Sequence, residues 1–297
     1  LYDQLVATAA LAVGLGAPSD PLIAKTLLVA PAIFGVFAIV PTFLIGRRIA
    51  GRGAALFGVA VLALLPGTFL QRTLVGFADH NGAEPFFMTM AAFALMIALG
   101  VAVRERPVWE LVQERNWGEL RWPTVTSAAA GFAAAMYMWV WPPGVLLVGI
   151  FGAFLLVALT SDHVVGESPE YVAFVGAVSM TVAGLTMLIP LQTLGFSATD
   201  FSLLQVVLPF AVAAGAVGLA ALSRLFEARD IDQAAFTLAT YGSAIVGAGV
   251  LALVLPDVFG LFAGNLRSVV GFSAGAELRT IAEAQPYLSP GTLRARG

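Results

Sequence analysis

The sequence lacks cysteine altogether and carries little charge. None of its 297 residues is Cys, and only 11% are Asp, Glu, Lys or Arg. Without cysteine, disulfide bonds and thiolate metal sites are excluded, and only oxygen and imidazole ligands remain for a metal ion. An ordinary soluble domain carries roughly 25% charged residues. The low charge therefore excludes a water-soluble globular protein.

Long hydrophobic runs occupy the sequence instead. Hydrophobic residues make up 59% of the chain, its mean hydropathy is +0.91, and the charged residues lie in short clusters between the runs. This pattern is typical of a polytopic membrane protein. Because a helix needs about 20 residues to cross ~30 Å of hydrocarbon, the chain is predicted to form an all-α transmembrane helix bundle with about eight spans.

Proline, glycine and arginine clusters mark where these spans are expected to end. An apolar stretch at 1–16 is shorter than a span, and we interpret it as an interfacial or re-entrant helix. The run 123–160 is too long for one helix, and Trp141-Pro142-Pro143-Gly144 divides it into a helical hairpin. The expected spans cover residues 22–46, 53–70, 85–103, the two arms of that hairpin, 171–190, 201–222 and 234–255.

Arginine is distributed unevenly between two sets of loops. Nine arginines lie in loops 47–52, 104–122 and 223–233, whereas the opposite loops 71–84, 142–143 and 191–200 hold only Arg72. The positive-inside rule places the first set in the cytoplasm. Six expected spans separate the polar segment 71–84 from the tail after residue 255, and this even number puts both on the outer face. Two distant polar segments can therefore share one external site.

The first candidate site lies in the polar segment 71–84. Asp79, His80, Asn81 and Glu84 bring two carboxylates, an imidazole and an amide to a helix boundary, in a chain with only two histidines. Oxygen and nitrogen donors at this spacing suit a divalent cation such as Mg²⁺ or Mn²⁺. Alternatively, Asp79 or Asn81 caps the following helix, and Glu84 lies near the positive end of its dipole. Spacing alone leaves both interpretations open.

The second candidate site lies in the tail, at Arg279-Thr280-Ile281-Ala282-Glu283. A carboxylate here would face the same side of the membrane as Asp79. Thr-x-x-Glu is also the capping-box pattern, in which a hydroxyl and a carboxylate satisfy backbone donors at the start of a helix. Both interpretations again remain open.

Other conspicuous side chains are given structural roles. His163 follows Ser161-Asp162 and is predicted to be a solvated loop histidine. Trp139 and Trp141 are expected to pack or to lie at the headgroup level. A transporter would need ionisable residues inside its spans, where this chain has little besides Lys25 near one end.

Taken together, these residues resemble the catalytic subunit of oligosaccharyltransferase in its archaeal, single-subunit form. Residues 72–81 look like that family's second acidic motif, and Thr280-Ile281-Ala282-Glu283 is similar to its external-loop Thr-Ile-x-Glu motif. The resemblance implies a lipid-dependent glycosyltransferase of the GT-C type, with both motifs on the outer face.

The resemblance covers nearly the whole chain and implies that it is an internal fragment, inactive alone. Residues 1–21 would end the first external loop with an interfacial helix, 22–255 would form the transmembrane domain, and 256–297 would be a truncated external catalytic loop. The family's first-loop aspartate and soluble C-terminal domain would be absent, and Asp3 is not assigned the role of that aspartate.

The implied reaction is protein N-glycosylation. An oligosaccharide passes from a dolichol (di)phosphate carrier to the asparagine of an Asn-x-Ser/Thr sequon, with inversion, in a metal-dependent reaction that uses Mn²⁺ or Mg²⁺. Asp79 and Glu283 would be the catalytic residues and metal ligands, with Asn81 and His80 as further ligands. Substrate contacts are expected from Arg72, Arg267, Arg279 and Thr280.

Two of these ligands are unusual. Asn81 stands where the family more often has Asp, Glu or His, so it brings a carbonyl oxygen without charge. Side-chain alternation along an extended loop predicts that His80 points away from Asp79.

The expected partners are the dolichol-linked oligosaccharide, an acceptor polypeptide with a sequon and the lipid bilayer, with no nucleic acid. The expected location is the cell membrane, as a multi-pass protein with an extracytoplasmic active site. Two alternatives are another polyprenyl-phosphate-dependent glycosyltransferase and a membrane transporter.

Overall fold

Most of the part of the chain that the structure describes is helical. The computed structural model describes residues 2–64, 67–101, 107–254, 256, 259, 260, 263 and 264. Within these residues the β-structure is limited to an isolated bridge between Thr193 and Ser202, which confirms the predicted all-α class. The chain divides into two compact units, 1–236 and 237–297. Most of helix α10 (Gln233–Val254) belongs to the second unit.

The first unit contains short and long helices. The short ones are α1 (Tyr2–Val13), α3 (Thr68–Arg72), α5 (Val108–Gln113) and the 3₁₀ turns η1 (His80–Gly82) and η2 (Pro142–Gly144). The long ones are α2 (Asp20–Leu64), α4 (Glu84–Val101), α6 (Trp117–Val140), α7 (Val145–Val165), α8 (Glu170–Met187) and α9 (Leu203–Ala228).

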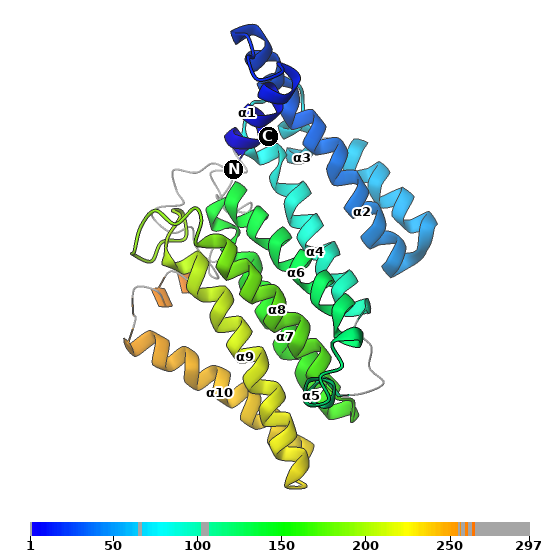
Figure 1. Ribbon diagram of the computed structural model, residues 1–297, viewed down its shortest axis with the longest axis vertical. Helices are drawn as coiled ribbons and strands as arrows, with labels where there is room; N and C mark the ends of the chain where they lie inside the picture. Colours follow the sequence, from blue (N-terminus) through cyan, green and yellow to red (C-terminus); the bar gives the residue numbers. More distant parts are fainter. Residues whose placement is uncertain are drawn as a thin grey trace, which may run out of the picture. The chain divides into compact units, whose positions relative to one another are not determined.

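Helix α2 is a hairpin with two arms. Gly51 interrupts its 45 residues with φ 83° and ψ 177°, a conformation that glycine adopts without steric cost. A β-carbon on Gly46 would lie 3.1 Å from Cα of Ala55, although nine residues of continuous helix would span about 13 Å. The chain therefore reverses where Figure 1 shows the two blue arms of α2 meeting, in agreement with the expected break near 47–52.

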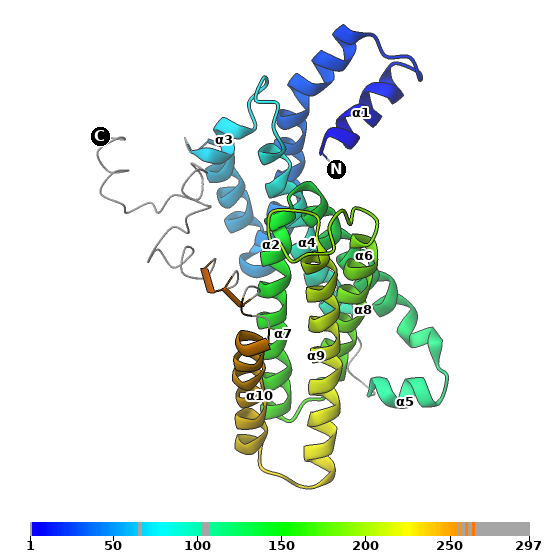
Figure 2. The same ribbon diagram turned by 90° about the vertical axis from the view of Figure 1, so that its left-hand side faces the viewer.

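Helices α4, α6, α8 and α9 form a row of neighbours, with α7 against α8 and α9 and with α2 against α4. Figures 1 and 2 show these helices side by side. Small residues allow the close approaches, as is usual between helices in membranes. A β-carbon on Gly131 of α6 would lie 2.0 Å from the carbonyl oxygen of Ser179 in α8.

Five helical segments in the described part of the chain are long and apolar enough to cross a membrane. They are Asp20–Leu64, His80–Val101, Pro142–Val165, Glu170–Met187 and Leu203–Ala228. The first of them is the hairpin α2, whose arms were expected as two spans. The total of eight spans stays a prediction.

The loops expected to be cytoplasmic meet at one end of the bundle. Glu170, at the start of α8, accepts a hydrogen bond of 2.8 Å from the backbone N–H of Trp109 and pairs with Nε of Arg224 at 2.8 Å. Residues from loops 104–122 and 223–233 therefore lie together beside the 161–169 connection. This arrangement agrees with the grouping of these loops by charge.

The prediction for His163 was wrong. Helix α7 continues through Ser161-Asp162-His163 until Gly166, which ends it with φ 83°. The His163 side chain is 5% exposed, its Nδ1 lies 2.7 Å from Oγ of Ser223, and its ring centroid lies 3.8 Å from that of Phe236. His163 thus joins α7 to α9, because the helix is one turn longer than expected.

Candidate active site

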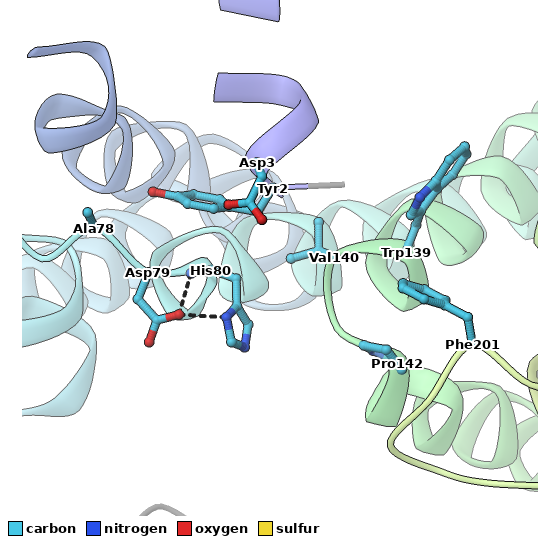
Figure 3. A pocket seen from close by; sticks show the side chains of 9 residues that line it. All are labelled: Tyr2, Asp3, Ala78, Asp79, His80, Trp139, Val140, Pro142 and Phe201. Atoms are coloured by element: carbon cyan, nitrogen blue, oxygen red, sulfur yellow. Dashed lines mark hydrogen bonds and ion pairs between the residues drawn. The ribbon is translucent and has the colours of Figure 1, made fainter. Parts of the chain in front are cut away.

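A pocket of about 380 Å³ lies where segments far apart in the sequence meet (Figure 3). Its walls are formed by Tyr2, Asp3, Ala78, Asp79, His80, Trp139, Val140, Pro142 and Phe201. These residues come from α1, the 73–79 loop, η1, the C-terminal end of α6, η2 and the residue that precedes Ser202, the N-cap of α9. Two of the loops that charge sorting assigned to the outer face, 71–84 and 142–143, therefore meet at one site.

Asp79 caps the short helix η1. Its backbone is extended, with φ −141° and ψ 155°, and its carboxylate accepts a 2.7 Å hydrogen bond from the backbone N–H of His80. The side-chain amide of Asn81 donates to the other carboxylate oxygen of Asp79. Asp79 is therefore an N-cap as predicted, but of the short η1 and not of the long helix α4 that follows. Asp79 and Asn81 also lie side by side, as the metal-site interpretation requires.

The His80 ring contacts Asp79, so the expectation that it points away was wrong. Its Nδ1 lies 2.6 Å from Oδ1 of Asp79, and its Nε2 lies 3.3 Å from Oε1 of Glu84. The reason is that His80 begins a 3₁₀ turn, where side chains no longer alternate as in an extended strand. The imidazole therefore lies between the carboxylates of Asp79 and Glu84.

Arg72 lies beside Asp79. Its Nη1 is 3.6 Å from Oδ2 of Asp79, and its guanidinium carbon is 4.8 Å from the ring centroid of Phe77. A guanidinium has five N–H donors and binds planar anions well. Arg72 therefore brings a positive charge to the carboxylate and has the donor geometry expected of a phosphate contact.

The loop that carries Asp79 is docked on the first arm of α2. The backbone N–H of Gly76 donates to the carbonyl of Leu28 at 2.8 Å, with Gly76 at φ 98°. Gly82 lies so close to this arm that a β-carbon would be 3.1 Å from Cβ of Pro31. Glycine at both positions lets the loop approach the helix and holds Asp79 at the pocket.

Tyr2 and Asp3 are pocket residues that the sequence analysis did not assign. The Tyr2 side chain is 5% exposed and belongs to an apolar cluster with Ala83 and Val140. Burial raises the pKa of Tyr2, and the nearby carboxylates of Asp79 and Asp3 raise it further. The Tyr2 hydroxyl is buried, and among the described residues it has no hydrogen-bond partner. No local pattern reveals these residues, because their place depends on how α1 packs against α2.

The described residues supply part of the predicted metal site. Within the described ranges, no group of three or more His, Cys, Asp or Glu side chains is arranged to hold a metal ion. Asp79 and Asn81 nevertheless bring a carboxylate and an amide together, and their oxygens are the donors that Mg²⁺ and Mn²⁺ prefer. These residues fit one part of such a site. Glu283, Thr280, Arg267 and Arg279 lie outside the described residues.

Residues 18–286 match the family model of oligosaccharyl transferase STT3, N-terminal. The chain belongs to this family. The expected resemblance is thereby confirmed, and the transporter alternative is not supported.

Two archaeal relatives of the STT3 family are informative. The chain is 58% identical over 297 residues to dolichyl-monophosphooligosaccharide–protein glycotransferase AglB of Haloferax volcanii, covering 100% of this chain and 28% of the relative. It is 27% identical over 268 residues to dolichyl-phosphooligosaccharide–protein glycotransferase 3 of Archaeoglobus fulgidus, covering 86% and 29%. The chain thus spans less than a third of these relatives.

Solved structures of an STT3-family relative share the fold. The A. fulgidus oligosaccharyltransferase AglB with an inhibitory peptide and a dolichol-phosphate matches with a TM-score of 0.76 and 24% identity, over 95% of this chain and 32% of that one. Its complex with Zn and sulfate matches with a TM-score of 0.71 and 23% identity, over 91% and 34%. These matches confirm the expected GT-C type of helix bundle.

Proposed function

We propose that this chain belongs to an oligosaccharyltransferase that transfers a dolichol-linked oligosaccharide to asparagine in Asn-x-Ser/Thr sequons. The observation that carries the proposal is the position of the 72–81 motif. In a chain of the STT3 family, Arg72, Asp79 and Asn81 gather at one turn, and Asp79 and His80 line the pocket beside it. The phosphate of a lipid-linked sugar donor can approach the Asp79 carboxylate there, because the Arg72 guanidinium offsets the repulsion between the two negative groups.

Residues of this chain hold and orient the charged groups that the reaction needs. The His80 N–H and the Asn81 amide hold both oxygens of Asp79 in place, and Arg72 offers N–H donors to a phosphate. Asp79 and Asn81, with His80 and Glu283, would hold Mn²⁺ or Mg²⁺. When bound, such a cation neutralises charge that develops on the departing phosphate. The A. fulgidus complex with Zn supports a divalent ion in general.

Glu283 would share metal binding and orient the acceptor amide of the sequon. Arg267 and Arg279 would join Arg72 at the phosphate of the carrier, and Thr280 would contact the substrate. These roles come from the motif resemblance, and the relatives named for dolichyl-linked oligosaccharides support the choice of substrate.

We place the pocket on the extracytoplasmic face of the cell membrane, in a multi-pass protein. The arginine-rich loops gather at one end of the bundle and the pocket lies among the other loops, which supports this orientation under the positive-inside rule. Residues 1–21 would end the first external loop, 22–255 would form the transmembrane domain, and 256–297 would form the external catalytic loop.

The test is a transfer assay with the full-length protein, a lipid-linked oligosaccharide and a sequon peptide. Chelation should abolish transfer and Mn²⁺ should restore it, while Asp79→Ala should reduce transfer by a factor of about 10² or more, the scale of losing an electrostatic catalytic group. Asp20→Asn, an exposed carboxylate at the start of α2, is the matched control and should leave transfer unchanged. Full activity in Asp79→Ala, or transfer that survives chelation, would overturn the proposal.

A further inference from the structure

The pocket has two walls of different chemistry. Asp3, Asp79 and His80 lie on one side, and Trp139 and Phe201 lie on the other (Figure 3). Asp79 and His80 belong to the charged turn already described. Asp3, Trp139 and Phe201 lie outside the 72–81 motif, and no role in the reaction has yet been given to them.

Phe201 is held in place by its backbone. Its carbonyl oxygen accepts hydrogen bonds from the N–H groups of Gln192 at 2.9 Å and Thr193 at 3.1 Å. The next residue, Ser202, caps α9 in a capping box with Gln205. Both residues are 1% exposed, so the backbone on each side of the Phe201 ring is fixed by buried contacts.

Gln205 also connects the two segments that form the aromatic wall. Its side-chain amide donates to the carbonyl of Pro142 at 3.3 Å and to the carbonyl of Ser197 at 3.2 Å. Pro142 follows the end of α6, which carries Trp139. A buried polar network therefore fixes the backbone beside Phe201 and links it to the turn after Trp139 before any ligand arrives, which lowers the entropic cost of binding.

Asp3 faces the pocket from the opposite side. It lies in the first turn of α1, directly after the buried Tyr2. In the described part of the chain its carboxylate makes no hydrogen bond or ion pair. An ionised carboxylate only accepts hydrogen bonds, so a ligand group that meets Asp3 must be a donor such as a hydroxyl.

A ring with an apolar C–H face and several hydroxyl donors matches both walls, and this is the chemistry of a sugar. We propose that the pocket binds the sugar ring next to the phosphate of the lipid-linked donor, with Phe201 and Trp139 against its C–H face and Asp3 accepting from its hydroxyls. Asp3 and Phe201 thereby determine donor specificity. The inference rests on the proposed function, because that function supplies a glycan joined to phosphate.

The pocket is large enough to hold a sugar ring. Its volume of about 380 Å³ is at the lower end of ligand pockets, which span roughly 300–1,000 Å³. Because Asp79 lies in the same wall as Asp3, a ring in this pocket lies beside the proposed metal and phosphate site. The remaining sugars of the oligosaccharide extend outside the pocket.

The first experiment measures donor and acceptor KM separately in the full-length protein. Asp3→Asn and Phe201→Leu should each raise the KM for the lipid-linked donor about tenfold, with the KM for the sequon peptide unchanged. Phe201→Tyr, which keeps the aromatic face, should restore the donor KM. The matched controls are Phe196→Leu, an exposed aromatic residue of the same loop that does not line the pocket, and Asp20→Asn.

The second experiment uses donors that each lack one hydroxyl of the first sugar. At least one such donor should bind the wild-type protein more weakly, and Asp3→Asn should show no further loss with that donor. Equal losses in both proteins would overturn the contact with Asp3. A raised KM for the sequon peptide instead of the donor would assign the pocket to the acceptor.

The two proposals fail in different ways. If the wild-type protein transfers no glycan to a sequon peptide, the proposed function fails whatever the variants do. If transfer is normal and neither Asp3→Asn nor Phe201→Leu changes the donor KM, the sugar pocket alone is overturned. Phe201→Tyr and Asp3→Asn are conservative enough to keep the test valid should Phe201→Leu fold poorly.

Discussion

Asp79 shows how one side chain serves two roles that look exclusive in the sequence. A carboxylate has two oxygens with about four acceptor positions. One oxygen accepts from the backbone and faces the ring of His80, and the other accepts from Asn81 near Arg72. The contacts that cap η1 therefore also orient the carboxylate toward the pocket. Capping is a means of positioning this group, and it leaves acceptor positions for a ligand.

Tyr2 provides a prediction at the residue scale. Its pKa is raised above 10.0 in the folded protein, so above pH 10 the unfolded chain loses this proton while the folded chain keeps it. The free energy of unfolding therefore falls as pH rises from the unfolded pKa to the folded pKa. Thermal unfolding from pH 8 to 11 should show a steeper fall for the wild type than for Tyr2→Phe. Parallel curves would show that the hydroxyl is not shielded by the fold.

At the scale of elements, small residues decide how the helices approach one another. Gly131 of α6 meets the backbone of Ser179, and Gly176 of α8 meets Leu155 and Ala216. In a membrane, such close approach replaces the hydrophobic effect as the attraction between helices. The row formed by α4, α6, α8 and α9 carries the turns that form the pocket. Helix packing thus determines the spacing between Asp79 and Phe201.

Gly131→Ala tests this packing. Its β-carbon would lie 2.0 Å from a backbone oxygen, so α6 and α8 must move apart, at a cost of about 1–3 kcal/mol in the free energy of unfolding. Gly149→Ala in α7 is the matched control, since its β-carbon would meet nothing within 4 Å. Thermal unfolding in detergent should show a lower Tm for Gly131→Ala only. Equal Tm values would mean that the interface adapts without cost.

At the scale of the whole molecule, the absence of cysteine makes the orientation directly testable. The first unit has a pocket at one end and the Glu170–Arg224 contact at the other. These 297 residues contain no Cys, so a single introduced cysteine is the one thiol within them. Leu194, which is 78% exposed in the loop before Phe201, and Ala228, exposed at the end of α9, are suitable positions.

A membrane-impermeant thiol reagent applied to intact cells should label Leu194→Cys and spare Ala228→Cys. When the membranes are permeabilised, both introduced cysteines should react, which controls for the accessibility of each thiol to the reagent. The expectation follows from the arginine asymmetry, since positively charged loops stay in the cytoplasm. The reverse pattern in intact cells would invert the proposed orientation and place the pocket inside the cell.

Features that depend on local chemistry could be predicted from the amino-acid sequence. Low charge and long apolar runs predict membrane helices, Gly51 and Pro142 mark breaks in them, and the spacing around Asp79 predicts a cap or a ligand. Each of these signals involves residues that lie close together in the sequence, so it can be interpreted without knowing how the helices pack.

Contacts between residues far apart in the sequence depend on how the helices pack and could not be predicted in this way. Tyr2, Asp3 and Phe201 reach Asp79 because of how α1, α2, α8 and α9 are arranged, and nothing in their own neighbourhoods indicates a site. The buried place of His163 likewise follows from its contact with Ser223, 60 residues away. A contact of this kind depends on the packing of whole helices, which no local pattern encodes.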